Sequence, residues 1–406
     1  MTEVAQVPSS DQRDRGQVKL PALTGLRAVA ALWVLALHFG EGVSATWPRA
    51  VRNVLSSGFI GVDLFFVLSG FILAWNYLRE DGTLRVSRSE FWSARAARIL
   101  PVYYISLGIS LPMFLLMQFG DGVTPSALRG AIVTGLTSLT LTQSWVSPFS
   151  YLWNNPGWSL SVELFFYLAF PWLVVWITRW PLAKLLRCVA GLYFVTIAAA
   201  YLFVALHSHP PTWKWEPAID YCIWISWLGC NPLVHAHEFL MGIAACLWFR
   251  DEQRGSRPEW MRGPAAVSVA GFGLAVLAAF RGPIPFMPAL AGIHSPLFAL
   301  LIYGLAKQRG TLARILSTPM FVYLGDISYS LYLTHLSVWL YMEGFNREHF
   351  FLRQDSMLNF SLCLALSLVL AAALYKGIEE PYRRFLRGYF GNPARALSSK
   401  LRRQVA

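Results

Sequence analysis

The 406-residue sequence is poor in charged residues and offers few cysteines. Charged side chains make up 14% of it while 55% of the residues are hydrophobic, whereas a soluble domain carries about 25% charged residues. Mean hydropathy is +0.45, and apolar runs of membrane-spanning length recur to the end of the chain. This composition excludes an ordinary soluble protein. It predicts an all-α, polytopic membrane protein with about ten transmembrane helices, a re-entrant segment and no soluble domain.

Other absences narrow the choice of function. The five cysteines lack metal-ligand spacing, and His207, His209, His235 and His237 form no convincing metal set. No nucleic-acid motif is present. We therefore expect no metal, no permanently bound cofactor and no nucleic-acid partner. No defensible internal repeat occurs, which argues against a transporter built from inverted halves.

Apolar length predicts the spans, and the arginines and lysines between them predict the orientation. Residues 1–19 are polar and are expected to be a cytoplasmic tail, because no signal-peptide core follows their charges. Residues 20–386 are expected to form the membrane domain and 387–406 a basic cytoplasmic tail. The expected spans lie near 21–41, 57–77, 99–119, 158–178, 188–206, 233–249, 264–281, 288–306, 318–342 and 357–376.

The weakly apolar stretch 127–147 decides the topology. If it crosses the membrane, the basic clusters at 79–98 and 179–187 fall on opposite sides. If it is re-entrant, every dense basic cluster lies on one face, so we expect it to dip in from the outer side. The net charge of +12 is then explained by basic cytoplasmic loops, and both termini are expected in the cytoplasm. The Trp-rich segment 218–230 is expected at the outer surface.

Ionisable residues inside the spans are costly in lipid and mark candidate functional positions. Arg27 and His38 share the first span and are eleven residues apart. This spacing is almost three helical turns, so both side chains point the same way, roughly 16 Å apart along the axis. We expect this helix to measure the distance between a phosphate anchor and a reaction centre. In the predicted topology the ionisable residues form an outer layer of His38, Asp63, Glu163 and His335 and an inner layer of Arg27, Arg95 and Arg98.

Each residue also has a plainer interpretation. His38 is the candidate general base, because neutral imidazole is available near its ordinary pKa of about 6.5, but a lone histidine is more often structural. Glu163 or Asp63 is the candidate for orienting it, yet each acid also suits the start of a helix. Arg95 and Arg98, at i and i+3, present two guanidinium forks suited to phosphate. They also fit an ordinary positive flank, and Arg27 fits a snorkelling arginine.

Six stretches resemble the integral-membrane acyltransferase family 3, whose members are ten-span O-acyltransferases that modify surface sugars and some natural products. The resemblance extends from Leu20 to about Leu386. The matching stretches are LTGLRAVAALWVLALH, GFIGVDLFFVLSGFIL, FWSARAARILPVYY, NNPGWSLSVELFFYLAFP, LGDISYSLYLTHLSVW and IEEPYRRF. In this family a basic residue is followed, after ten residues, by a histidine, and Arg27 and His38 match this motif. The family's RxxR motif matches Arg95 and Arg98. Its Trp-Ser-Leu…Glu motif matches Trp158, Ser159, Leu160 and Glu163.

The resemblance implies transfer of an acyl group, acetyl in the first place, from cytoplasmic acyl-CoA to a hydroxyl of a surface or secreted glycan or glycosylated small molecule. It implies a multi-pass protein of the bacterial cytoplasmic (inner) membrane, surrounded by the lipid bilayer. Arg27, Arg95 and Arg98 would bind the CoA phosphates. His335, Trp158 and Tyr332 are expected to contact the acceptor. Some members carry a C-terminal hydrolase-like domain, which we do not expect here, so direct transfer is favoured.

A proton-coupled transporter or exporter is the alternative function. It would use His38, Asp63 and Glu163 as a proton relay. It accounts for the intramembrane acids equally well, but it leaves Arg27 and the RxxR pair unexplained. Turnover of acyl-CoA by detergent-purified protein separates the two functions, since transport needs a sealed compartment and acyl transfer does not.

Overall fold

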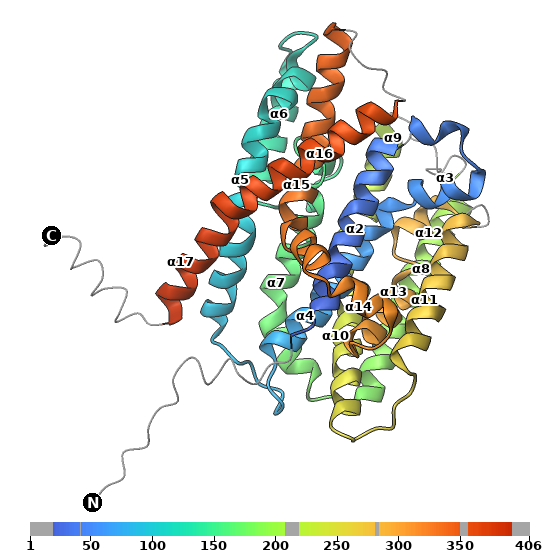
Figure 1. Cartoon of the computed structure of the whole chain (residues 1–406). Helices are drawn as coiled ribbons and strands as arrows, with labels where there is room; N and C mark the ends of the chain where they lie inside the picture. The colour runs from blue at the N-terminus through green and yellow to red at the C-terminus, as the bar shows by residue number, and fades with distance from the viewer. Residues whose placement is uncertain (1–18, 41, 208–218, 281–283, 350–355, 392–406) are drawn as a thin grey trace, which may run out of the picture.

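The computed structural model describes residues 19–40, 42–207, 219–280, 284–349 and 356–391 (Figure 1). Most of the two expected tails lies outside these ranges. The described chain is helical, with one isolated bridge between Leu78 and Leu84, which confirms the all-α prediction. Its long helices are α2 (Pro21–Gly40), α4 (Gly61–Tyr77), α5 (Arg88–Phe119), α7 (Gly157–Ile177), α8 (Leu182–Leu206), α10 (Ala236–Gln253), α11 (Gly263–Ala279), α15 (Pro319–His349) and α16 (Met357–Leu374).

Shorter helices connect the long ones. Seven of the described helical stretches are long and apolar enough to cross a membrane, and α11 is a shorter apolar helix. The number of ten crossings stays a prediction. The shorter helices are α3 (Arg49–Ser56), α6 (Pro125–Leu139), α9 (Ile219–Gly229), α12 (Phe286–Leu290), α13 (Ser295–Ala306), α14 (Thr311–Leu316) and α17 (Glu380–Gly391).

The two ends of the bundle differ in their number of arginines. The connections 78–87 and 254–262 lie at the lower end in Figure 1, whereas α3, α9 and α12 lie at the upper end. We call the lower end the basic end, because these two connections carry Arg79, Arg85, Arg254, Arg257 and Arg262.

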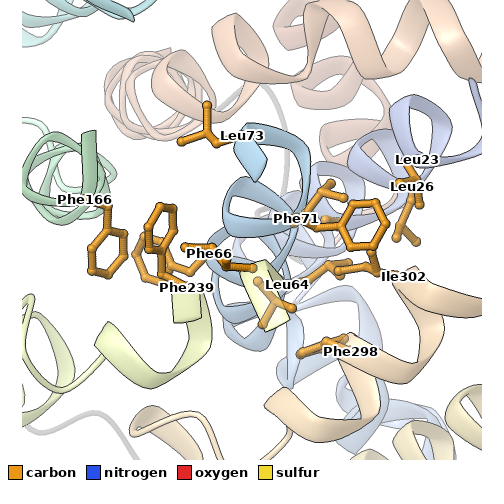
Figure 2. Packing of buried hydrophobic residues seen from close by; sticks show 14 of the residues in the cluster. Leu23, Leu26, Leu64, Phe66, Phe71, Leu73, Phe166, Phe239, Phe298 and Ile302 are labelled. Atoms are coloured by element: carbon orange, nitrogen blue, oxygen red, sulfur yellow. The ribbon is translucent and has the colours of Figure 1, made fainter. Parts of the chain in front are cut away.

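Helix α4 lies at the centre of the hydrophobic core. Its buried side chains point to several neighbours at once (Figure 2). Phe66 packs edge-on against Phe166 of α7, whose ring stacks on Phe239 of α10 with centroids 4.6 Å apart. Phe71 of α4 belongs to the same core cluster as Leu23 of α2. The polar residues carried by α4 are therefore fixed by packing on several sides.

Helices α4 and α10 cross at two glycines. A Cβ atom at Gly70 would lie 2.0 Å from the carbonyl oxygen of Phe239, and one at Gly242 would lie 1.9 Å from that of Val67. Small residues at such a crossing let two backbones approach closely, which favours packing between membrane helices. This contact sets the distance between the first turns of α4 and α10.

We expect Gly242→Ala to destabilise the protein, because the added methyl group must push α10 away from Val67. Overpacking of this kind costs about 1–3 kcal/mol, so the midpoint of thermal unfolding should fall by about 5 °C. Tryptophan fluorescence of detergent-purified protein measures it. Gly271→Ala on α11 is the matched control, since a Cβ there meets nothing within 4 Å. Equal midpoints for the two variants would contradict the close crossing.

The segment after α5 enters the bundle without crossing it as one helix. Helix α6 ends beside the middle of α5, where the hydroxyls of Tyr103 and Tyr104 donate to the carbonyls of Ser138 and Leu139. The chain then forms a buried polar connection that leads to α7. In this connection the Asn154 side-chain amide donates to Ser106 Oγ and to the Leu333 carbonyl. The buried side chains of Gln143 and Ser144 donate hydrogen bonds to backbone carbonyls at the start of α7. These bonds satisfy backbone and amide groups at depth, as a re-entrant segment requires.

Two of the expected spans differ from the observed helices through a local structural feature. The span expected at 99–119 is the end of a 32-residue helix that begins at Arg88 with a capping box between Ser87 and Glu90. The span expected at 288–306 is interrupted between α12 and α13, where Gly292 has a φ of +81°. Apolar length alone shows neither feature, because a capped polar turn can extend a helix and a single glycine can break one.

Candidate active site

A cavity of about 100 Å³ lies between α2, α4, α5, α7 and α15. Its lining includes Arg27 from α2, Arg95 and Arg98 from α5, and Glu163 from α7. Three guanidinium groups and one carboxylate therefore face one space inside the bundle. The structure brings together all three predicted phosphate-binding arginines, which are separated by up to 71 residues in the chain.

Helix α5 positions two of the arginines. Arg95 and Arg98 are one turn apart, roughly 10 and 15 Å from the helix start at the basic end. Arg95 Nη2 donates to the Tyr77 hydroxyl at 2.7 Å, and its guanidinium lies over the rings of Tyr77 and Tyr167 at 5.2 and 5.8 Å. Its buried Nε has no hydrogen-bond partner. Arg95 is thus held in place with a buried donor still unpaired, an arrangement suited to binding an anion.

Arg27 completes the cationic part of the cavity. It lies within electrostatic reach of Arg98, Glu163 and Glu379. Glu379 is buried at the π-helical turn that joins α16 to α17, and it accepts a hydrogen bond from Ser330. The two acids offset part of the arginine charge, which makes three neighbouring guanidinium groups tolerable when no anion is bound.

Glu163 is held by its own helix and by α4. Its Oε1 accepts hydrogen bonds from the Tyr167 hydroxyl and, at 3.2 Å, from Ser69 Oγ. The contacts of Glu163 therefore belong to the arginine cavity, and none of its described hydrogen bonds reaches His38. Tyr167, which our sequence analysis missed, also covers Arg95. The i, i+4 spacing of Glu163 and Tyr167 was the available signal.

Tyr332 marks the other end of the cavity. Its side chain lines the cavity, and its hydroxyl accepts a hydrogen bond from Ser159 Oγ at 3.0 Å. The Tyr332 ring also lies 5.9 Å from the ring of His335, which lies 5.2 Å from that of His38. Arg27 lines the cavity and His38 does not. Tyr332 and His335 connect the cavity to His38.

The two histidines form an imidazole pair with one defined tautomer. His335 is fully buried, and its Nδ1–H donates to the carbonyl of Tyr332 at 2.6 Å. A carbonyl oxygen only accepts, so Nε2 of a neutral His335 carries the lone pair, and this atom has no hydrogen-bond partner. A hydrogen-bond acceptor thus lies beside His38, as a site for a hydroxyl requires.

The structure places Asp63 and Trp158 in a different cluster. Asp63 lies with His235 and Glu238, whose ligand atoms come within 4.8 Å of its own. Trp158 packs against His235 and Phe66 and does not line the cavity. No described contact joins Asp63 to His38. This grouping was not predicted, because Asp63 and His235 are 172 residues apart in the chain.

Comparison with known proteins gives one consistent result. Residues 20–376 match the family described as "Acyltransferase domain". The chain is 32% identical over 389 residues to the acyltransferase MdmB of Streptomyces mycarofaciens, covering 91% of this chain and 93% of that protein. It is 25% identical to a candidate O-acetyltransferase of Staphylococcus aureus and 24% identical to the candidate peptidoglycan O-acetyltransferase YrhL of Bacillus subtilis. It spans 57% and 55% of these two relatives. No solved structure matches the chain.

Proposed function

Because this chain belongs to that acyltransferase family, we propose that it transfers an acyl group, acetyl in the first place, from cytoplasmic acyl-CoA to a hydroxyl of a glycan or glycosylated small molecule. The observation that carries the proposal is the convergence of Arg27, Arg95 and Arg98 on one intramembrane cavity. Phosphate groups are the natural ligands of such a set. An acyl-CoA combines phosphates with a thin arm that ends in a thioester.

The size of the cavity limits how the donor binds. The cavity volume of about 100 Å³ is well below the roughly 300–1,000 Å³ of pockets that enclose a drug-sized ligand, so it is too small for a nucleotide. We infer that the nucleotide stays toward the basic end and that its phosphates contact the arginines. The acyl-pantetheine arm then passes through the cavity toward Tyr332 and widens it. The roughly 16 Å along α2 between Arg27 and His38 gives the length to be crossed.

The reaction follows from the imidazole pair. The acceptor hydroxyl attacks the thioester carbonyl and His38 takes its proton, while His335 Nε2 accepts a hydrogen bond from a second hydroxyl of the acceptor and so positions the reacting one. A carbon–oxygen bond forms and the carbon–sulfur bond breaks. The CoA thiolate leaves and takes up the proton, so the imidazole returns to its neutral form. Since neither Asp63 nor Glu163 contacts His38, His335 is the neighbour of His38 in this mechanism.

The charge of the basic end supports the orientation in the membrane, and the related proteins support the class of acceptor. The arginines at the basic end support a cytoplasmic position for that end, which places His38 toward the outer face. A relative described as a candidate peptidoglycan O-acetyltransferase supports a glycan acceptor. Exposed Trp145 and Trp227 side chains suit stacking on sugar rings. Direct transfer to an outer acceptor accounts for the order of arginines, cavity and histidines.

The test uses detergent-purified protein and acetyl-CoA labelled in the acetyl group. We expect label to move to hydroxyl-bearing saccharides, or to extracts of surface glycans and secreted glycosides, with equal release of free CoA. No sealed compartment is needed for this turnover. Label transfer that occurs only across sealed vesicles, or no transfer with any of these acceptors, would contradict the proposal. Mass spectrometry of the product then identifies the acceptor.

Glu163→Gln separates two roles of this carboxylate. Because Glu163 bonds to Tyr167 and Ser69 among the arginines, we expect the loss of its charge to strengthen phosphate binding. The KM for acyl-CoA should fall by about tenfold, the order expected for removing one like charge several ångströms away. The pH profile of kcat should stay in place. A displaced profile with an unchanged donor KM would mean that Glu163 acts on His38 instead.

A further inference from the structure

The second cluster of ionisable residues lies where α4 and α10 begin. Asp63 is in the first turn of α4, His235 is the residue before α10, and Glu238 is in its first turn. Their side chains are buried, with 3%, 0% and 0% of the residue surface exposed. One ligand atom from each lies within 4.8 Å of the others. The glycine crossing of α4 and α10, one to two turns further along, holds these two first turns together.

The tautomer of His235 shows that something must lie between it and Glu238. His235 Nε2–H donates to the carbonyl of Gly229 at 2.9 Å, so Nδ1 of the neutral ring carries the lone pair. This Nδ1 lies 3.2 Å from Glu238 Oε1. A lone pair that faces a carboxylate oxygen at this distance is repulsive unless a proton or a metal ion bridges the two atoms. The backbone carbonyl on the far nitrogen is the usual outer partner of a metal-binding histidine.

Charge and unmet bonding favour a metal ion over a proton. Among the described residues, neither Asp63 nor Glu238 has an arginine or lysine within 4.0 Å, and the ion pair of Glu238 is with His235. Asp63 Oδ2 and Glu238 Oε2 are buried without hydrogen-bond partners. One proton can bridge two of the three groups, but the third then has no hydrogen-bond partner. A divalent cation binds all three and neutralises both carboxylates, although the two helix N-termini also offset part of their charge.

We propose that Asp63, His235 and Glu238 bind a divalent first-row transition-metal ion, of which zinc, manganese and iron(II) suit one imidazole and two carboxylates. Two ligands at about 2.1 Å from one ion are at most about 4.2 Å apart, so a pair near the 4.8 Å limit closes by at least about 0.6 Å on binding, while His235 Nδ1 and Glu238 Oε1 are already 3.2 Å apart. The ion has a structural role: it ties α4 to α10. It also supports the cavity wall, since Phe66 lines the cavity and its ring lies 4.9 Å from that of His235.

The surroundings of the cluster fit a closed site. Phe66 and Trp158 flank the His235 ring, at 4.9 and 5.6 Å, which keeps water away and strengthens metal–ligand attraction. Gly292 lies against Glu238 on another side, where an added Cβ would be 1.9 Å from Oε1. The family resemblance and the proposed function do not require this ion. It departs from our own expectation that the chain has no metal.

Metal content of the purified protein tests the proposal without measuring activity. We expect about one equivalent of zinc, manganese or iron per chain by mass spectrometry after gel filtration in chelator-free buffer. In Asp63→Asn and in His235→Ala the metal content should fall at least about tenfold. Loss of a residue that hydrogen-bonds to a metal ligand weakens metal binding by about 10- to 100-fold, and loss of the ligand itself weakens it at least as much. His207→Ala is the control, since this histidine at the end of α8 bonds to Phe203 and Trp224 packs on it. Its metal content should match that of the wild type.

A second measurement keeps the test valid if a variant does not fold. A chelator should lower the thermal midpoint of the wild type, and added zinc should restore it. The proposal is overturned if wild-type protein holds no metal as purified and takes up none on incubation with zinc, manganese or iron(II). The cluster would then be held together by a shared proton. It is also overturned if folded Asp63→Asn retains the wild-type metal content. Neither result bears on acyl transfer, which is measured separately.

Discussion

Replacing His38 by alanine should lower kcat for acyl transfer by about 10²- to 10⁴-fold, the usual contribution of a general base. The KM for acyl-CoA should stay close to that of the wild type, because His38 does not line the arginine cavity. A second hydroxyl of the acceptor would keep its hydrogen bond to His335, but the reacting hydroxyl would have no base to take its proton. Release of CoA and formation of the labelled ester, measured together on detergent-purified protein, give both constants.

The control for this experiment is His207→Ala, which removes an imidazole at the end of α8. It should retain wild-type kcat. Thermal midpoints of both variants show whether the fold is kept, since loss of the His38 ring also removes a contact with His335 at 5.2 Å. A folded His38→Ala protein with full transfer activity would remove His38 from the mechanism.

Charge reversal at Arg98 should weaken the binding of the donor, acyl-CoA. We expect Arg98→Glu to raise the KM for acyl-CoA by roughly 10- to 100-fold, because a charge-assisted hydrogen bond contributes about 1.5–3 kcal/mol and the new carboxylate repels phosphate. The KM for the acceptor should stay near its wild-type value. Initial rates with each substrate varied in turn measure the two constants, and direct titration with CoA measures donor binding.

The matched control for Arg98→Glu is Arg88→Glu on the same helix. Arg88 lies three turns earlier, is exposed, and rests over the ring of Trp172 at 5.3 Å. The same change in net charge at this position should leave the donor KM unchanged. If both variants weaken the donor equally, the effect comes from the overall positive charge of the basic end. If Arg98→Glu weakens donor and acceptor alike, the cavity is not a donor site.

Local spacing was enough to predict that Arg95 and Arg98 lie together, whereas Arg27 was grouped with them by its depth and by the family resemblance. Arg95 and Arg98 lie on one helical face by their i, i+3 spacing, and the structure shows them in one cavity with Arg27. Arg27 and His38 were expected to face a common cavity, but Arg27 lines it while Tyr332 and His335 lie between it and His38. Helical periodicity gives the direction of a side chain, whereas the side chains packed around it depend on other helices.

The position of Asp63 shows where the same reasoning fails. Depth in the membrane placed Asp63, Glu163 and His38 in one layer, but depth does not tell which helices are neighbours. The glycine pair at Gly70 and Gly242 brings α4 against α10, so Asp63 meets Glu238 and His235. Only a prediction of this crossing would have shown that the acid and His235, distant in sequence, belong together.

A structure of the purified protein with a non-hydrolysable acetyl-CoA analogue tests most directly whether the arginine cavity and the imidazole pair are two ends of one donor path. The account predicts analogue phosphates in contact with Arg27, Arg95 and Arg98, the pantetheine arm passing Tyr332, and the acyl carbon next to His38 and His335. An analogue bound away from the arginines, or one whose acyl end points away from His38, would contradict it.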